Sequence, residues 1–216
     1  MNEYIKSLLE EENFLCELRA AAEADNVPIL RSDAAAFLKT VVASKAPDRI
    51  LEAGTAVGYS SLLMAYACTD KNGVCNVHID TVELDLDTVQ AAKRNIKKAG
   101  YENNIRVIPG DAAEVFSCIG GQEVYDLIFI DSAKSQYIEM YDDIKRLLAP
   151  GGIVICDNVI FYGKIYEKPE DAPHKHRTII ANLRAFLEKL TSDEDYSTCI
   201  LETGDGMTFS VKRKEE

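Results

Sequence analysis

Apolar and polar positions alternate along this chain as short apolar runs separated by longer amphipathic segments. The apolar runs are rich in β-branched residues and are bounded by turn residues, which is typical of buried parallel strands. Between them, apolar residues recur at three- and four-residue spacing, which predicts helices. The predicted strands are 49–53, 76–84, 104–109, 125–130 and 153–156.

Helical spacing also dominates the segment before the first strand. Apolar residues within 4–22 predict one or two helices that end near Asp25, and Ser32 or Asp33 is placed to cap another. We expect residues 1–45 to cover the sheet or a partner subunit, so that a homodimer is predicted.

The end of the chain predicts a helix followed by a hairpin. Residues 178–190 have helical spacing, and Gly204-Asp205-Gly206 separates two strand-like runs. Together these patterns predict an α/β fold: a doubly wound, Rossmann-like sheet of seven strands, mostly parallel, with a C-terminal antiparallel hairpin strand and helices on both faces.

Length and composition restrict the class of protein. The 216 residues suit a single domain over 1–216, and a composition of 47% hydrophobic and 28% charged residues is ordinary for a globular protein. Without a secretory signal or a membrane-length apolar run, a cytoplasmic location with no membrane partner is expected. The net charge of -12 argues against broad nucleic-acid binding but leaves room for a local basic patch. The six scattered cysteines are predicted to be reduced core thiols.

Two predicted strands end in oxygen-bearing side chains. Asp131 follows the strand at 125–130, and Asp157 and Asn158 follow the strand at 153–156. If these strands are neighbours, the three side chains meet at one carboxyl edge, where open α/β sheets bind ligands. Alternatively, Asp157 and Asn158 simply begin a turn.

A glycine-containing turn follows the first strand. Gly54 and Gly58 permit close backbone approach to a ligand, and the next helix directs unpaired N–H groups toward it. The second strand ends in Glu83, where a carboxylate can bind ribose hydroxyls, so an adenosine-containing cofactor is predicted. Ala56 departs from the dinucleotide fingerprint, which makes NAD the weaker candidate. The alternative is that both glycines serve only helix–strand packing.

Asp111 follows the third strand and has two interpretations. Its carboxylate can accept a hydrogen bond from an adenine amine, and it can also cap the helix that begins after it. Both roles can coexist.

Six segments carry a family resemblance. LEAGTAVGYSS, TVELD, GDAAEVF, FIDSAKSQY, CDNVIFYGK and GDGMTFS occur in order over nearly the whole chain. Together they resemble the cation-dependent class I O-methyltransferases of the catechol and caffeoyl-CoA type. Within that group, NVPIL and DNVIFYGK look most like the bacterial tRNA 5-hydroxyuridine methyltransferases.

The resemblance implies an enzyme that uses S-adenosylmethionine as methyl donor. It places a divalent cation, Mg²⁺ or else Mn²⁺ or Ca²⁺, on Asp131, Asp157 and Asn158, and such oxygen ligands suit these hard cations. Lys134, with Asp131, is implied to be catalytic, removing the acceptor's hydroxyl proton or stabilising its oxyanion; the alternative is a solvated lysine. The residues implied to bind the donor are Glu52, Gly54, Gly58, Tyr59, Ser60, Glu83, Asp111, Ala112 and Asp131.

The acceptor is the least determined part of the prediction. Our first expectation is the 5-hydroxyl of 5-hydroxyuridine in tRNA, with a catechol-like or caffeoyl-CoA-like phenol as the alternative, since both acceptors offer adjacent oxygens. An NAD-linked oxidoreductase and a non-catalytic donor-binding protein are more distant alternatives. A tRNA contact would use a local basic cluster in the segment 161–177, although the same residues also fit a solvated loop of mixed charge: Lys164, Lys168, His174, Lys175, His176 and Arg177.

Overall fold

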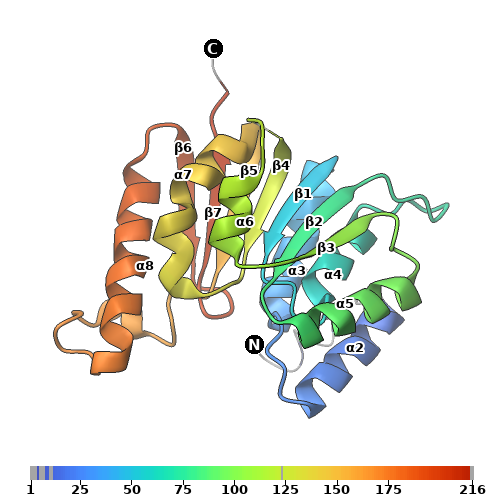
Figure 1. Cartoon of the computed structure of the whole chain (residues 1–216), viewed down its shortest axis with the longest axis horizontal. Helices are drawn as coiled ribbons and strands as arrows, with labels where there is room; N and C mark the ends of the chain where they lie inside the picture. Colours follow the sequence, from blue (N-terminus) through green and yellow to red (C-terminus); the bar gives the residue numbers. More distant parts are fainter. Residues whose placement is uncertain (1–3, 5–7, 10–11, 123, 215–216) are drawn as a thin grey trace. The chain divides into compact units, whose positions relative to one another are not determined.

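The computed structural model describes residues 4, 8–9, 12–122 and 124–214. The predicted N-terminal helix residue Ile5 lies outside the described residues. The chain divides into two compact units, residues 1–110 and 111–216, and each is presented by itself. Figure 1 labels the elements of both.

The first unit is a parallel three-stranded sheet with helices packed against it (Figure 1). Its strand order is β3-β2-β1, with Ala53 opposite Val82 and Glu83 opposite Pro109. Helix α5 packs on β2 and β3, whereas α4 contacts both α2 and α3. The elements are α2 (Asn13–Ala24), α3 (Ser32–Lys45), β1 (Arg49–Ala53), α4 (Tyr59–Ala67), β2 (His78–Glu83), α5 (Leu86–Ala99) and β3 (Ile105–Pro109).

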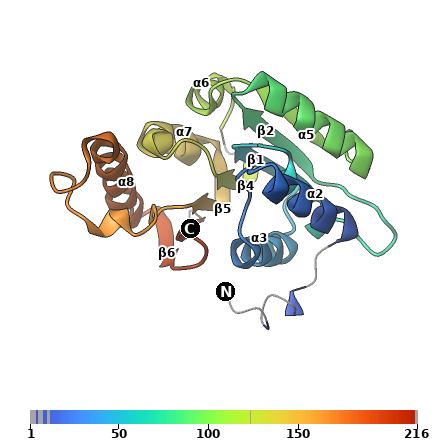
Figure 2. The ribbon, with the colours of Figure 1, turned by 90° about the horizontal axis from the view of Figure 1, so that it is seen from below.

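The second unit is a mixed sheet in the strand order β4-β5-β7-β6. Strands β4 and β5 are parallel, whereas β7 is antiparallel to both of its neighbours. Helices α7 and α8 lie side by side, as Figure 2 shows. The elements are α6 (Ala112–Cys118), β4 (Tyr125–Ile130), η1 (Lys134–Gln136), α7 (Tyr137–Leu147), β5 (Leu148–Asp157), η2 (Lys164–Tyr166), α8 (His174–Ser192), β6 (Tyr196–Leu201) and β7 (Met207–Lys212).

The seven strands confirm the predicted fold class, a mostly parallel Rossmann-like sheet that ends in an antiparallel hairpin. The structure also corrects three details. β5 begins at Leu148, before the expected 153, and α8 begins at His174, before the expected 178. Of the predicted core thiols only Cys156 is buried, whereas Cys16, Cys118 and Cys199 are exposed. Among the described residues, no helix has both the length and the apolar character required to span a bilayer.

A buried tyrosine holds together the two strands that end in acids. Tyr137 is fully buried at the start of α7, and its hydroxyl donates to the carbonyl of Asp157 at 2.9 Å, with the carbonyl of Ile130 at 3.3 Å. Burial raises the pKa of this tyrosine well above its usual value, so the hydroxyl stays protonated and donates. Tyr137 therefore fixes the carboxyl ends of β4 and β5 beside each other.

Candidate functional site

The turn between β1 and α4 has the left-handed backbone that glycine permits. Gly54 has φ 97°, Ala56 has φ 45° and Gly58 has φ 87°, all in the left-handed region. Gly58 immediately precedes α4, which begins with the predicted residues Tyr59 and Ser60. A β-carbon at Gly58 would meet only ordinary contacts at 3.6 Å, so glycine is needed there for its backbone conformation.

Glu83 links this turn to the end of β2. Its Oε2 accepts the backbone N–H of Ala56 at 2.9 Å, and its Oε1 accepts that of Asp85 at 3.0 Å. A carboxylate has about four acceptor positions, so two hydrogen bonds leave capacity for ligand hydroxyls. The exposed side chains of Leu84 and Leu86 flank it. The predicted ribose-binding residue is therefore held in place by the turn itself.

Glu52 is a predicted donor-binding residue that lies beneath the turn. Its side chain is fully buried, its Oε2 accepts the hydroxyls of Ser61 and, at 2.6 Å, Thr81, and the hydroxyl oxygens of Thr81 and Thr55 lie 2.6 Å apart. A buried carboxylate surrounded by hydroxyls is a structural support. Any effect of Glu52 on the donor would pass through the position of the turn.

Asp111 opens the second unit and accepts three hydrogen bonds from its neighbours. Its Oδ1 accepts the backbone N–H groups of Ala113 and Glu114, as predicted for a helix cap, and its Oδ2 accepts from Gln136 Nε2 at 2.6 Å. The hydrogen bond from Gln136 is the main cause that lowers the pKa of Asp111. Asp111 therefore remains an acceptor, next to the buried Ala112.

The two acids at the ends of β4 and β5 lie close enough to interact electrostatically. Asp157 is 3% exposed, and its Oδ1 accepts the backbone N–H of Asn158 at 2.7 Å. Burial, and then the negative charge of Asp131, raise the pKa of Asp157 to about 7. A cation between these acids would favour their charged forms, so this pair and the adjacent Asn158 fit a divalent cation.

Lys134 lies beside Asp131 and is largely shielded from solvent. Its Nζ lies 3.2 Å from Oδ1 of Asp131, and only 23% of its side chain is exposed. The 3₁₀ turn η1 holds it there. Beside Asp131, the hydroxyl of Ser132 is buried and has no hydrogen-bond partner among the described residues.

The structure does not itself identify a metal. In the part of the chain that it describes, no group of three His, Cys, Asp or Glu side chains is placed to hold one. The predicted ligand set contains two carboxylates and one amide, so the cation remains a prediction that rests on the chemistry of these oxygens.

The predicted basic cluster is partly used within the protein. Lys164 lies over the rings of Phe161 and Tyr162, at 5.6 and 5.9 Å from their centroids. Arg177 donates to the carbonyl of Ala172 at 3.0 Å. The remaining cations stand among exposed acids, so the cluster does not form a uniform basic surface.

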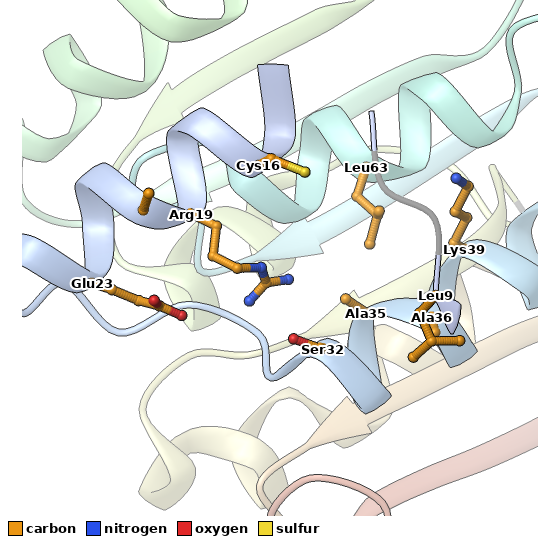
Figure 3. Close-up of a pocket in the computed structure, with 10 residues that line it drawn as sticks. Leu9, Cys16, Arg19, Glu23, Ser32, Ala35, Ala36, Lys39 and Leu63 are labelled. Carbon is orange, nitrogen blue, oxygen red and sulfur yellow. The ribbon is translucent and has the colours of Figure 1, made fainter. Parts of the chain in front are cut away.

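A cavity lies elsewhere in the first unit, between α2, α3 and α4 (Figure 3). Arg19 extends from α2 toward Ser32, donates to the carbonyl of Leu30 at 2.8 Å and to the hydroxyl of Tyr59, and stacks over the Tyr59 ring. Of the predicted site residues, only Tyr59 takes part in these contacts. The cavity therefore borders the donor-turn helix from the side of α2.

Sequence reasoning missed several residues that organise these sites. Gln136 orients Asp111, and Ser61 and Thr81 hold Glu52. The paired residues are 9 to 29 positions apart in the chain, and no local pattern marks them. Asp205 was taken as a turn residue only, yet its carboxylate binds the segment after Asn158.

Comparison with known proteins identifies the family. The family model described as O-methyltransferase matches residues 6–213. A catechol O-methyltransferase from Niastella koreensis is 32% identical over 178 residues, covering 80% of this chain and 78% of that protein. A caffeoyl-CoA O-methyltransferase from Stellaria longipes is 27% identical and covers 92% of this chain and 83% of its own length.

Solved structures agree with the sequence relatives. The crystal structure of a candidate caffeoyl-CoA O-methyltransferase from Staphylococcus aureus has a TM-score of 0.85 and 30% identity, covering 97% of this chain and 98% of that one. An O-methyltransferase from Bacillus cereus, solved in complex with SAH, shares the fold with a TM-score of 0.84 at 24% identity, covering 98% and 96%. The prediction of an S-adenosylmethionine-dependent methyltransferase is thus confirmed at the level of the family. The chain belongs to the O-methyltransferase family.

Proposed function

We propose that this protein is a divalent-cation-dependent enzyme that transfers a methyl group from S-adenosylmethionine to one hydroxyl of a small phenol with adjacent oxygens. The observation that carries the proposal is the cluster of Asp131, Asp157 and Lys134 at the ends of β4 and β5. The cluster brings carboxylate oxygens and the Lys134 side chain to the place where the phenol hydroxyl would lose its proton.

In this proposal the first unit supplies most of the donor-binding residues. The N–H groups at the start of α4 and the left-handed turn before it would bind the polar end of a ligand. Glu83, already fixed by the N–H of Ala56, accepts from ribose hydroxyls. The donor supplies an electrophilic methyl group on a sulfonium sulfur.

The second unit holds the acceptor. A cation bound by Asp131, Asp157 and Asn158 would lower the pKa of the acceptor hydroxyl and fix its orientation. Lys134 Nζ, oriented by Asp131, would accept the hydroxyl proton as a neutral amine, or would stabilise the oxyanion by its charge as an ammonium group. The acceptor oxygen then forms the bond to the methyl carbon while the carbon–sulfur bond breaks.

A phenol acceptor takes precedence over the tRNA acceptor that we expected first. The curated relatives reported above are named for catechol and caffeoyl-CoA acceptors. In addition, the basic cluster around 161–177 is interrupted by acids, and its Lys164 and Arg177 have contacts within the protein. These observations favour the phenol over the tRNA. The tRNA acceptor is therefore included in the test as a competing substrate.

The test is mass spectrometry of methyl transfer with three acceptors: a catechol, a caffeoyl thioester and tRNA that contains 5-hydroxyuridine. Each reaction is run with Mg²⁺ and with EDTA. We expect methylated phenol only when Mg²⁺ is present. Transfer to tRNA alone would overturn the acceptor, and equal phenol transfer in EDTA would overturn the role of the cation.

A further inference from the structure

The segment after Asn158 has an unfavourable backbone that the rest of the second unit must hold in place. Asn158, Phe161 and Tyr162 have φ of 56°, 52° and 55°. The left-handed region is disfavoured for residues with a β-carbon, so three such residues within five positions would not persist without outside support. Tyr162, four residues after a predicted cation ligand, is 81% exposed.

The support comes from the turn between β6 and β7. Antiparallel pairing of β5 with β7 ends at Asp157 and Met207. Beyond it, the N–H of Val159 donates to the carbonyl of Gly206 at 3.0 Å, and the N–H of Ile160 donates to that of Asp205 at 2.9 Å. The turn therefore follows the segment residue by residue.

The carboxylate of Asp205 makes the last contact. Its Oδ1 and Oδ2 both accept the backbone N–H of Tyr162, at 2.7 and 2.9 Å. Hydrogen bonds to a charged acceptor are roughly twice as strong as neutral ones. A neutral side chain of the same shape would retain one oxygen, whereas alanine would retain none.

The turn between β6 and β7 also packs closely against the segment after Asn158. Gly206 is buried with φ 86°, and a β-carbon there would meet Cγ1 of Ile160 at 2.3 Å. A glycine is thus required beside Asp205, and an added methyl group would displace the same segment by a different route.

We propose that Asp205 is a positioning residue that holds the segment 158–163 so that Asn158 and Tyr162 face the acceptor. The expected kinetic effect rests on the proposed function. The hydrogen bonds by which Asp205 holds the segment 158–163, called here the Asp205 clamp, do not depend on it. Donor binding belongs to residues outside this segment and is independent of it. The acceptor specificity of the enzyme therefore depends on a residue more than forty positions away in the sequence.

The test compares Asp205→Ala and Asp205→Asn with the wild type. For Asp205→Ala we expect the KM for the phenol to rise about 10- to 100-fold, which is the loss expected for a hydrogen bond to a charged group. The dissociation constant of S-adenosylhomocysteine, measured by calorimetry, stays within about 2-fold. Asp205→Asn recovers part of the KM. The matched control is Asp171→Ala, which removes the same charge from an exposed loop position.

A second readout needs no activity. Chymotrypsin should cut after Phe161 or Tyr162 at least 10-fold faster in Asp205→Ala and in Gly206→Ala than in the wild type and the control, measured well below the midpoint of thermal unfolding of each variant. Wild-type rates of cleavage in Asp205→Ala would overturn the clamp. A wild-type enzyme that methylates no phenol would overturn the proposed function, while the cleavage rates would still decide the role of Asp205.

Discussion

Lys134 is the residue whose chemistry depends most directly on a single contact, the 3.2 Å ion pair with Asp131. We expect Lys134→Ala to lower kcat by roughly 10²- to 10⁴-fold, the usual contribution of a positioned proton-transfer group. Lys134→Arg keeps the charge but cannot accept a proton at neutral pH. Steady-state kinetics of both variants therefore separate the two roles of Lys134.

The control for this comparison is Lys189→Ala. Lys189 also forms an ion pair in the second unit, with Asp142 at 2.7 Å. Asp142 is exposed and is not part of the proposed site. Its kcat should match the wild type. A Lys134→Ala enzyme with normal kcat would show that the Lys134 side chain neither removes the hydroxyl proton nor stabilises the oxyanion.

At this scale the sequence predicts which residues end each strand, but not how their side chains are paired. Asp131 and Lys134 can be found because a strand end and a three-residue spacing are local features. The burial of Glu52 under Ser61 cannot be found, since it depends on how α4 packs on β1 and β2. The contact of Asp111 with Gln136 likewise joins residues 25 positions apart.

Between elements, Asp193 connects α7 to the end of α8. Burial opposes its charged form, but hydrogen bonds from Lys145 and Tyr141, both at 2.6 Å, lower the pKa of Asp193 to about 2. Because the folded pKa lies below the ordinary value of 3.8, the stabilisation is fully present above about pH 4 and is lost as the pH falls through 2.

The corresponding prediction concerns Asp193→Asn. Its free energy of unfolding should be lower than that of the wild type by about 2 kcal/mol at pH 7, and the difference should shrink toward zero near pH 2. Urea denaturation at both pH values measures this. Asp142→Asn, whose side chain is 85% exposed, should show almost no difference at either pH.

Most element bounds follow from apolar spacing, and the exceptions have identifiable causes. The first turn of α8 is His174-Lys175-His176-Arg177, which has no apolar residue to show a helical period. The start of β5 contains Pro150, Gly151 and Gly152, which are ordinary turn signals, although here they continue the strand. Apolar spacing therefore does not predict where a helix with a polar first turn or a strand with glycines at its start begins.

For the whole molecule, donor and cation should stabilise the fold independently. Each ligand at about 100 times its dissociation constant should raise the free energy of unfolding by about 2.7 kcal/mol. We expect Asp157→Ala to lose the stabilisation by Mg²⁺ and to keep that by S-adenosylhomocysteine, because Asp157 is a predicted cation ligand and is not among the predicted donor-binding residues. Thermal shift assays with each ligand measure both effects.

An undiminished Mg²⁺ shift in Asp157→Ala would contradict the assigned cation ligands. Glu194→Ala, an exposed position of the same unit, serves as the control for loss of one negative charge. At this scale the sequence predicted the fold class and the family, but the acceptor could not follow from it. Both kinds of acceptor offer adjacent oxygens, so the ligand set alone does not distinguish them.

The strand order of the second unit also restricts the order in which it can form during synthesis. Strand β6 pairs with β7 alone among the described strands, and β7 inserts between β6 and β5. As the chain leaves the ribosome, β6 therefore emerges before any strand that it can pair with. The nascent chain must keep β6 unpaired until residues 207–212 have emerged, and only then can the Asp205 turn meet the segment after Asn158.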